Sequence, residues 1–175
     1  MTGQEREVLQ ALDALGITYE RYEHPPIATA ADGEVHWAGI DAVHCKNLFL
    51  RNQKGDRHYL VILAHNKRAD LRAAANQIGD GKLSFGSPER LMKHLGVTPG
   101  SVSPYALIHD PEHHVRLFLD RDLKGAARIS FHPNINTATV VTTFADFEKF
   151  LSASGVTPRY IDVGAGSSAA ASSSL

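Results

Sequence analysis

Apolar side chains recur at helical spacing near the start of the chain, and the pattern changes to alternation shortly afterwards. The residues at helical spacing are Val8, Leu9, Leu12 and Leu15. Thr2 and Glu5 form a capping-box pattern in front of them, and Gly16 is a suitable helix end. The sequence therefore predicts a first helix that ends near Gly16, followed by a strand over residues 17–22.

The middle of the chain predicts a β-hairpin between two helices. Residues 46–52 and 57–64 read as buried strands that flank the polar turn QKGD. Before them, Thr29 and Asp32 can cap a second helix. After them, residues 69–78 place their apolar side chains on one helical face.

Further elements are expected in the second half of the chain. A short helix should start at Ser87-Pro88 and end at Gly96, before a turn-rich loop over residues 96–104. The expected strands that follow cover residues 105–109, 115–120, 127–132 and 137–143, and the last expected helix covers residues 144–152. This order predicts an α+β fold, with a mixed, mostly antiparallel sheet flanked by helices.

The length of 175 residues suits one domain, which we place at residues 1–163. From Gly164 onward the sequence contains only small or polar residues until the final Leu175. Such a composition offers almost nothing to bury, so we expect residues 164–175 to form a disordered Ser/Ala tail.

Net charge and cysteine content narrow the classes of function. The formal net charge of −1 gives no general attraction to nucleic acids, so any such contact needs a local basic patch. The single cysteine, Cys45, excludes an internal disulfide, as is usual in a reducing compartment. Neither a membrane-spanning run nor a signal layout is visible, so the sequence favours a cytoplasmic protein without membrane contact.

The first candidate for chemistry is Lys46-Asn47, at the entrance of an apolar strand. An ammonium group in a partly dehydrated place acts strongly on an anion or a polarised carbonyl. The alternative is that the Lys46 side chain merely extends from a strand end into water.

The second and third candidates are two loops. Gly100, Ser101, Val102, Ser103 and Pro104 form a glycine-to-proline loop whose N–H groups can bind an oxyanion or an ester, although most such loops are only turns. His132, which precedes Pro133 at a strand end, can line a pocket as a hydrogen-bonding group or act as a general base. A purely structural role for His132 is equally open.

Other motifs give weaker signals. The stretch HDPEHH contains metal-ligand types, but its spacing fits no metal motif and is typical of a turn, so we expect neither a metal site nor a cofactor. Cys45 has no recognisable activating partner beyond the adjacent His44, so a buried, unreactive thiol is the default. The basic residues Lys67, Arg68, Arg72, Lys82, Arg90 and Lys93 can form either a small phosphate-binding face or an ordinary solvated one.

Taken together, three segments carry a resemblance that none of them carries alone. The segments are HCKNLFLRNQKGDRHYLVIL, LSFGSPERLMKHLGVTPGSVSPYALIHD and ISFHPNINTATVV. They resemble the ProX branch (ProXp-ala, PrdX-like) of the YbaK/prolyl-tRNA synthetase-associated domain family, the trans-editing proteins related to the insertion domain of prolyl-tRNA synthetase. The resemblance covers about residues 5 to 161.

This resemblance implies a free-standing deacylase that hydrolyses Ala-tRNA(Pro). It makes Lys46 the essential lysine, with Asn47 beside it, and it maps the family's Gly-x-x-x-Pro loop onto Gly100 and Pro104. It also assigns His132 to the shaping of a small pocket. The implied partners are the acceptor end of aminoacylated tRNA(Pro) and, as a docking partner, prolyl-tRNA synthetase.

The activated ester of such a substrate explains why no catalytic triad is needed. We expect Lys46 to anchor a phosphate or carbonyl, loop amides 101–103 to bind the ester oxygen, and the ribose 2′-hydroxyl to help activate water. Because alanine is smaller than proline, selectivity must work by exclusion, with Ile27, Thr29 and Val43 as expected wall residues. Two alternatives stay open: a deacylase for a Cys- or Ser-charged tRNA, and a non-catalytic tRNA-binding module.

Overall fold

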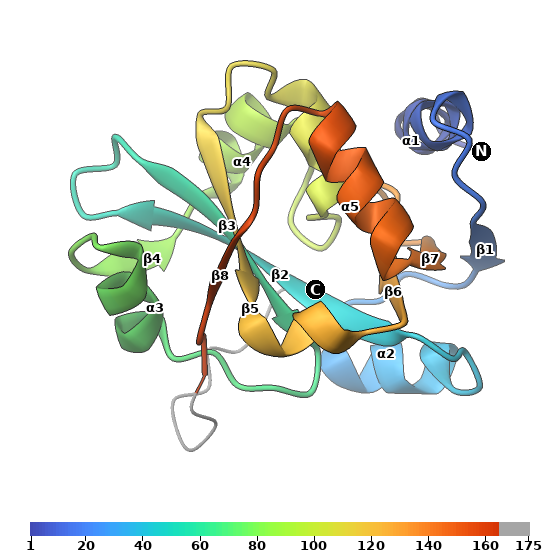
Figure 1. Ribbon diagram of the computed structural model, residues 1–175, viewed down its shortest axis with the longest axis horizontal. Helices are drawn as coiled ribbons and strands as arrows, with labels where there is room; N and C mark the ends of the chain where they lie inside the picture. The colour runs from blue at the N-terminus through green and yellow to red at the C-terminus, as the bar shows by residue number, and fades with distance from the viewer. Residues whose placement is uncertain (165–175) are drawn as a thin grey trace.

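The strand β2 (Val43–Asn52) organises the structure, because three other strands pair with it. The computed structural model describes residues 1–164, so nearly all of the tail expected over residues 164–175 lies outside the described residues. The described strands form one sheet in the order β1-β7-β6-β2-β3-β5-β8, and β4 also pairs with β2 (Figure 1). The other strands are β1 (Glu20–Glu23), β3 (His58–Ala64), β4 (Leu83–Phe85), β5 (Val115–Asp120), β6 (Arg128–Phe131), β7 (Ala138–Thr143) and β8 (Arg159–Ile161).

Antiparallel and parallel ladders both occur in this sheet. The pairs β1–β7, β6–β7, β2–β3 and β2–β4 are antiparallel. The pairs β2–β6, β3–β5 and β5–β8 are parallel. The expected α+β fold with a mixed, mostly antiparallel sheet is therefore confirmed.

Helices cover the sheet, and side-chain caps fix where several of them begin. Thr29 starts α2 with a complete capping box, in which its hydroxyl accepts from Asp32 N–H and the Asp32 carboxylate accepts from Thr29 N–H. In Figure 1, α5 lies along one face of the sheet, and α3 lies beside β4. The helices are α1 (Gly3–Ala14), α2 (Ala30–Trp37), α3 (Leu71–Ile78), α4 (Pro88–Leu95) and α5 (Phe144–Ala153).

One expected strand was wrong, and two short strands were missed. Residues 105–109 belong to the 3-10 helix η1 (Pro104–His109), because Pro104 fixes a helical φ and the Ser103 hydroxyl accepts from Tyr105 N–H. The apolar run there is buried as a helical turn, which periodicity cannot distinguish from a strand. The missed β4 and β8 have three residues each, too few to show any period.

The first strand and a further 3-10 helix also differ from expectation. The structure places β1 at Glu20–Glu23, later than the expected residues 17–22, while Ile17 is buried in the core before the strand begins. A second 3-10 helix, η2 (Arg121–Gly125), follows β5. Within residues 1–164, none of the helices is long and apolar enough to cross a membrane.

Apolar clusters lie on both faces of the sheet, and β2 contributes to each of them. Cys45 and Phe49 belong to the larger cluster, whereas Leu48 and Leu50 belong to the cluster beneath α3. Because side chains alternate along a strand, Asn47 faces the side of the larger cluster and Lys46 faces the side of the α3 cluster. The two residues of the first candidate site therefore stand on opposite faces of β2.

Candidate active site

The sheet is interrupted beside β2, and this interruption defines the candidate site. β3 pairs with β2 continuously along one edge. On the other edge, β6 pairs only with the start of β2, at Val43 and His44, and β4 pairs only with its end, from Leu50 to Asn52. The stretch from Cys45 to Leu48 between these two partners forms an open edge.

The hydrogen-bond pattern shows which peptide groups face this open edge. His65 N–H donates to His44 O at 2.8 Å, and Asn52 N–H donates to Arg57 O at 3.1 Å, so the even-numbered peptides of β2 face β3. The odd-numbered peptides face the other way. The N–H and C=O of Asn47 therefore point into the gap, where no acceptor or donor from residues 1–164 meets them.

Lys46 places a cation on this edge with little access to water. Its exposed fraction is only 6%, and its Nζ has neither a hydrogen bond nor a carboxylate within 4 Å in the described part of the chain. Burial lowers the pKa of Lys46, and the nearby positive charge of Arg68 lowers it further. A nearly buried ammonium without a counter-ion is costly unless a ligand supplies the negative charge.

The Asn47 side chain adds a second unsatisfied group. Only 1% of this residue is exposed, and its Oδ1 has no hydrogen-bond partner within residues 1–164. Buried amide oxygens are nearly always hydrogen-bonded, so an orphaned one indicates a ligand position. Lys46 and Asn47 thus supply a cation, an amide and a free peptide unit around one short edge.

His132 borders the same gap. The parallel register pairs Val43 with Ile129 and His44 with Ser130, so its continuation by two residues brings His132 level with Lys46, where the strands separate. His132 Nδ1 donates to Ala138 O at 3.0 Å, which leaves Nε2 as an acceptor. Burial lowers the pKa of His132 to about 4, so the ring is neutral at pH 7.

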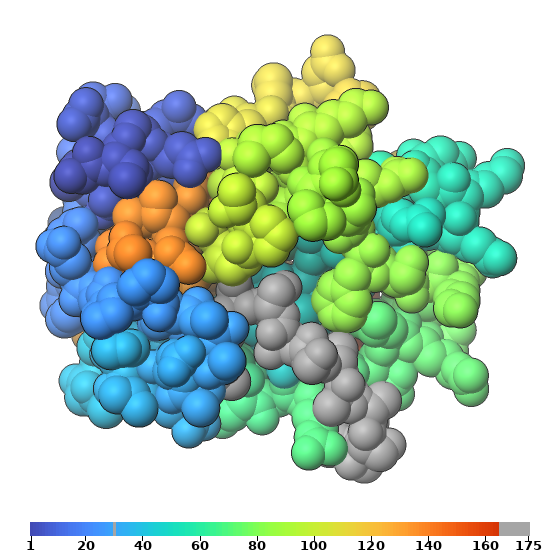
Figure 2. All heavy atoms as spheres, turned by 180° about the vertical axis from the view of Figure 1, so that it is seen from behind, coloured from blue at the N-terminus to red at the C-terminus, as the bar shows by residue number. Residues whose placement is uncertain are grey.

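The glycine-to-proline loop meets the segment after His132. Gly100 has a φ of +90°, a conformation that favours glycine, and a side-chain carbon there would lie 3.8 Å from Asn136 Nδ2. Asn136 O in turn accepts from Ile27 N–H at 3.2 Å. Figure 2 shows the light-blue segment before and within α2, the orange β6–β7 region and the yellow-green loop gathered on one face.

The loop amides are not equally available. Ser101 N–H already donates to Thr98 O at 3.0 Å, so it is engaged within its own turn. The amides of Val102 and Ser103 have no acceptor among the described residues, although both residues are buried. The Ser103 hydroxyl caps η1 at Pro104. The expectation of three free amides at 101–103 therefore reduces to two in this conformation.

The expected wall residues lie in different surroundings. Ile27 is fully buried and clusters with Trp37, whose ring centroid lies 6.3 Å from that of His132. Thr29 is exposed, and its hydroxyl is engaged in capping α2. Val43 is partly buried against the larger apolar cluster. Of the three, only Ile27 packs against a neighbour of His132, namely Trp37.

Aromatic and polar residues that the sequence did not single out also border the site. Trp37 stacks on His44 with 4.6 Å between ring centroids, and His65 meets its edge at 5.3 Å. Asn134 has a φ of +62°, is 1% exposed, and both polar atoms of its side chain lack partners in the described chain. The asparagines in HPNIN were the only available signal, since a buried asparagine with positive φ cannot be recognised from spacing.

The weaker candidates add no reactive group to this site. Cys45 is buried, and burial raises the pKa of its thiol, which makes the thiolate scarce. In the HDPEHH stretch, the ring of His109 is held by Leu95 O at 2.7 Å and by the Glu7 carboxylate at 2.5 Å. Within the described residues, no group of three or more metal-ligating side chains is close enough to hold an ion.

The basic residues do not form one continuous face. Lys67 is neutralised by Asp120 at 2.7 Å and by Asp122 at 2.8 Å. Arg90 turns toward the β2–β3 hairpin, where it donates to Gly55 O at 2.8 Å. Arg72 and Lys82 lie elsewhere, at a cavity between α3 and β4.

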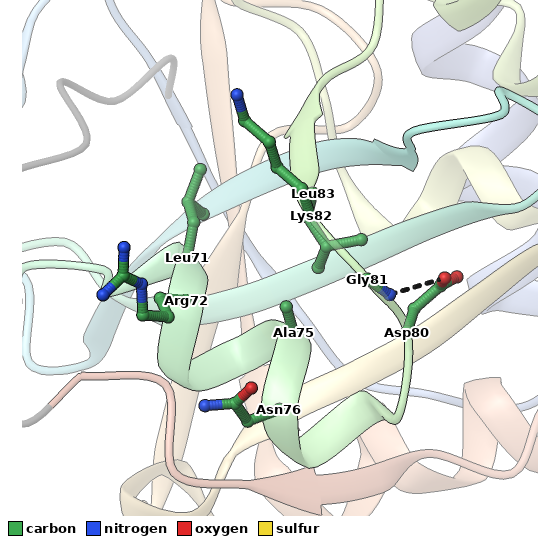
Figure 3. Close-up of a pocket in the computed structure, with 8 residues that line it drawn as sticks. All are labelled: Leu71, Arg72, Ala75, Asn76, Asp80, Gly81, Lys82 and Leu83. Atoms are coloured by element: carbon green, nitrogen blue, oxygen red, sulfur yellow. Dashed lines mark hydrogen bonds between the residues drawn. The ribbon is translucent and has the colours of Figure 1, made fainter.

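That cavity has a volume of about 570 Å³ and is shown in Figure 3. Arg72 and Lys82 extend away from its apolar floor of Ala75 and Leu83, and Asp80 lies at the opposite end. It contains none of the residues of the open edge. Size alone therefore does not single out a reaction site, and the unsatisfied groups around Lys46 make the open edge of β2 the candidate.

Comparison with known proteins shows the family of the chain. Residues 24–150 match the family described as "Aminoacyl-tRNA editing domain". The chain is 40% identical over 157 residues to the "Prolyl-tRNA editing protein ProX" of Acetoanaerobium sticklandii, which covers 89% of this chain and 95% of that protein. It is 32% identical over 164 residues to "Prolyl-tRNA synthetase associated domain-containing protein 1" of Mus musculus, covering 90% and 96%.

Solved structures share the fold. A structure described as that of a candidate trans-editing enzyme for prolyl tRNA synthetase superposes with a TM-score of 0.65 at 21% identity, over 94% of this chain and 99% of that one. A hypothetical protein, APE2540, gives a TM-score of 0.69 at 18% identity, over 89% and 98%. Together with the family match over residues 24–150, these findings show that the chain belongs to the aminoacyl-tRNA editing domain family and is an aminoacyl-tRNA deacylase.

Proposed function

We propose that this deacylase hydrolyses alanine from mischarged tRNA(Pro), acting in trans on the acceptor end. The observation that supports this most strongly is the nearly buried Lys46 ammonium at the open edge of β2, without a counter-ion in the described chain. An aminoacyl-tRNA end supplies both a phosphate and a polarised ester carbonyl to such a cation. The 40% identity to a prolyl-tRNA editing protein favours the proline tRNA as the carrier.

In the proposed reaction, water adds to the ester carbonyl and the bond from the acyl carbon to the ribose oxygen breaks. The products are free alanine and a tRNA with a restored terminal hydroxyl. Lys46 holds a phosphate or the carbonyl, while the amides of Val102 and Ser103 stabilise the negative charge that develops on the oxygen. Preorganised donors of this kind each contribute about 10² to 10³ in rate.

His132 has a hydrogen-bonding role in this proposal. With its Nδ1–H directed to Ala138 O, the neutral ring offers Nε2 as an acceptor for the substrate ammonium or the ribose 2′-hydroxyl. A pKa of about 4 makes it a weak base at pH 7, so the ribose 2′-hydroxyl, rather than His132, helps to activate water.

Selectivity follows from exclusion of the larger side chain. Ile27, held beside Asn136 and Trp37, is the best placed of the three proposed wall residues. Thr29 and Val43 stay in the proposal on the resemblance alone. One methylene in an apolar pocket discriminates by only about 1–3 kcal/mol, so a pocket too small for a ring must reject proline sterically. Serine and cysteine approach alanine in size, which keeps Ser- and Cys-charged tRNA as the alternative substrates.

The proposal places the protein in the cytoplasm, where charged tRNA is used, with prolyl-tRNA synthetase as a docking partner. A deacylation panel tests it. Wild-type protein, Lys46→Ala and the surface control Lys149→Ala should be incubated with tRNA(Pro) charged with alanine, cysteine, serine or proline. The proposal expects selective loss of alanine by wild type and control, and little loss by Lys46→Ala.

Other outcomes of the panel point elsewhere. Faster hydrolysis of the cysteine or serine ester would support the alternative substrates. Binding of tRNA without hydrolysis of any ester would support a non-catalytic module and contradict the proposal. Loss of activity with EDTA would indicate a metal that the proposal does not include.

A further inference from the structure

The hydroxyl group of Thr139, on β7, joins three separate segments of the chain. It accepts a hydrogen bond from Trp37 Nε1–H at 3.0 Å, and it lies 2.8 Å from His24 Nε2. Thr139 is only 1% exposed, so water has little access to these contacts. One side chain of β7 thereby connects the end of α2 with the segment that precedes α2.

One arrangement of protons satisfies every polar atom in this network. The indole N–H can only donate, so the Thr139 oxygen accepts from Trp37. His24 Nδ1 lies 2.8 Å from Pro25 O, which can only accept, so Nδ1 carries a proton. Burial lowers the pKa of His24, which favours the neutral ring. Its Nε2 therefore accepts the hydroxyl proton of Thr139, and the chain of hydrogen bonds runs from Trp37 through Thr139 and His24 to Pro25 O.

The register of the sheet places this network beside His132. The antiparallel ladder of β6 and β7, continued by one residue, pairs His132 with Thr139, and opposite side chains share a face. The ring centroid of His132 lies 6.1 Å from that of His24 and 6.3 Å from that of Trp37. The parallel ladder of β2 and β6 puts His132 on the same face as Lys46. The network therefore stands on the face of the sheet that carries the candidate catalytic lysine.

The apolar wall near His132 has few contacts of its own to keep it in place. Its cluster contains Ile27 and Trp37 as buried members, with Ile40 packed against them, and it is much smaller than the two main clusters. Stacking on His44 sets the plane of the indole ring but allows the ring to slide within that plane. The hydrogen bond at Nε1 removes this freedom, because it fixes one atom of the ring.

We propose that Thr139 is a positioning residue for selectivity, whose hydroxyl holds Trp37 and the segment that carries Ile27 against His132. The inference rests on the proposed function, because it takes the acyl group of the substrate to lie beside His132. Thr139 itself does not contact the substrate and acts through Trp37 and His24. Without the hydroxyl, the indole ring can shift in its plane, so the pocket widens and a larger acyl group can enter.

Four variants separate this role from a general effect on the fold. Thr139→Val removes the hydroxyl and keeps the shape of the side chain, whereas Thr139→Ser keeps the hydroxyl. Trp37→Phe keeps an aromatic ring without the N–H. Thr142→Val is the matched control, because Thr142 is also buried on β7 but faces the other side of the sheet and bonds to Thr143 O at 2.9 Å. Thermal melting should confirm that every variant is folded.

Single-turnover hydrolysis of Ala-tRNA(Pro) and Pro-tRNA(Pro) measures the selectivity. Thr139→Val should raise the ratio of proline to alanine rates about 10- to 200-fold, while Thr139→Ser and Thr142→Val should keep the wild-type ratio. Trp37→Phe should also raise the ratio, and adding Thr139→Val to it should raise the ratio no further, because both changes remove one hydrogen bond. A merely structural residue would slow both esters together and leave their ratio unchanged.

The fluorescence of Trp37 tests the contact without any substrate, because Trp37 is the only tryptophan in the sequence. Thr139→Val should shift the emission maximum and increase quenching by acrylamide, since the indole ring is no longer held in place. Thr139→Ser and Thr142→Val should match wild type in both measurements. Unchanged emission and quenching in Thr139→Val would overturn the proposal.

The selectivity role and the proposed function fail in different ways. If wild type hydrolyses the alanine ester selectively but Thr139→Val keeps the same ratio, or if Thr142→Val changes the ratio equally, only the role of Thr139 falls. If wild type hydrolyses another misacylated tRNA instead, the ratio is taken against that ester and only the substrate assignment falls. If wild type hydrolyses no ester, both proposals fail.

Discussion

Replacement of Lys46 by methionine should make the protein more stable and less active. Methionine keeps most of the length and apolar character of the lysine stem but removes the charge. Lys46 is 6% exposed and has no counter-ion in residues 1–164, so the wild-type fold keeps an uncompensated charge from water. Removing an unsatisfied buried polar group should recover about 1–3 kcal/mol of unfolding free energy.

The pH dependence of this gain follows from the pKa shift. The folded-state pKa of Lys46 is lowered, so between that value and the unfolded value of about 10.4 the unfolded chain binds more protons than the folded one. Wild-type stability therefore rises with pH in that window. The advantage of Lys46→Met should be full below the folded pKa and should shrink as the pH rises above it.

Urea unfolding of both proteins, measured at pH 7 and again above pH 9, gives the stability difference. Single-turnover deacylation at pH 7 gives the activity difference, which should be a loss of about 10² to 10³ if Lys46 contacts the reacting ester or its phosphate. If Lys46→Met is destabilised, or if it retains activity, Lys46 is an ordinary structural lysine and the reasoning fails.

Three further changes test other parts of the account. Gly100→Ala should lower the unfolding free energy by about 1–2 kcal/mol, because its φ of +90° disfavours a side chain, and it should also slow deacylation. Gly125 has an ordinary φ and open space around it, so Gly125→Ala should change neither the stability in urea titrations nor the rate of deacylation. Gly86→Ala should destabilise the protein by about 1–3 kcal/mol, because the new methyl group overlaps the Phe49 ring. Gly81→Ala should have a much smaller effect, since the space around Gly81 is open, and an equal effect of the two changes would argue against the close contact. Burial lowers the pKa of His132 to about 4, so between about pH 6.5 and pH 4 the unfolded state binds more protons than the folded state. The unfolding free energy should therefore fall as the pH is lowered through that window, with His132 contributing up to about 3 kcal/mol of the loss. His132→Asn should flatten this fall in urea titrations at pH 4.5 and pH 7, and an unchanged slope would show that His132 is not held neutral.

The sequence predicted elements where local chemistry and periodicity agree. The helix starts at Thr2, Thr29 and Ser87 depend on a side chain that caps a nearby N–H, and such caps are visible in the residues themselves. The β2–β3 hairpin was also predictable, because two apolar runs flank a turn sequence. These features need no knowledge of distant contacts.

The interruption of the sheet could not be predicted in the same way. It exists because β6 and β4 pair with opposite ends of β2, and both pairings join segments far apart in the chain. β4 has only three residues, and the expected strand at 105–109 became a 3-10 helix through the cap at Ser103. Resemblance to a family identified Lys46, Asn47, Gly100 and His132, whereas Trp37 and Asn134 emerged only from their positions in the fold.

The central claim is that the open edge of β2 removes alanine from tRNA(Pro) and spares correctly charged proline. Single-turnover hydrolysis of Ala-tRNA(Pro) and Pro-tRNA(Pro), followed side by side with excess wild-type protein, tests it most directly. The account predicts rapid loss of the alanine ester and a proline ester that decays no faster than without protein. Equal rates for the two esters, or an alanine ester that outlasts the proline ester, would contradict it.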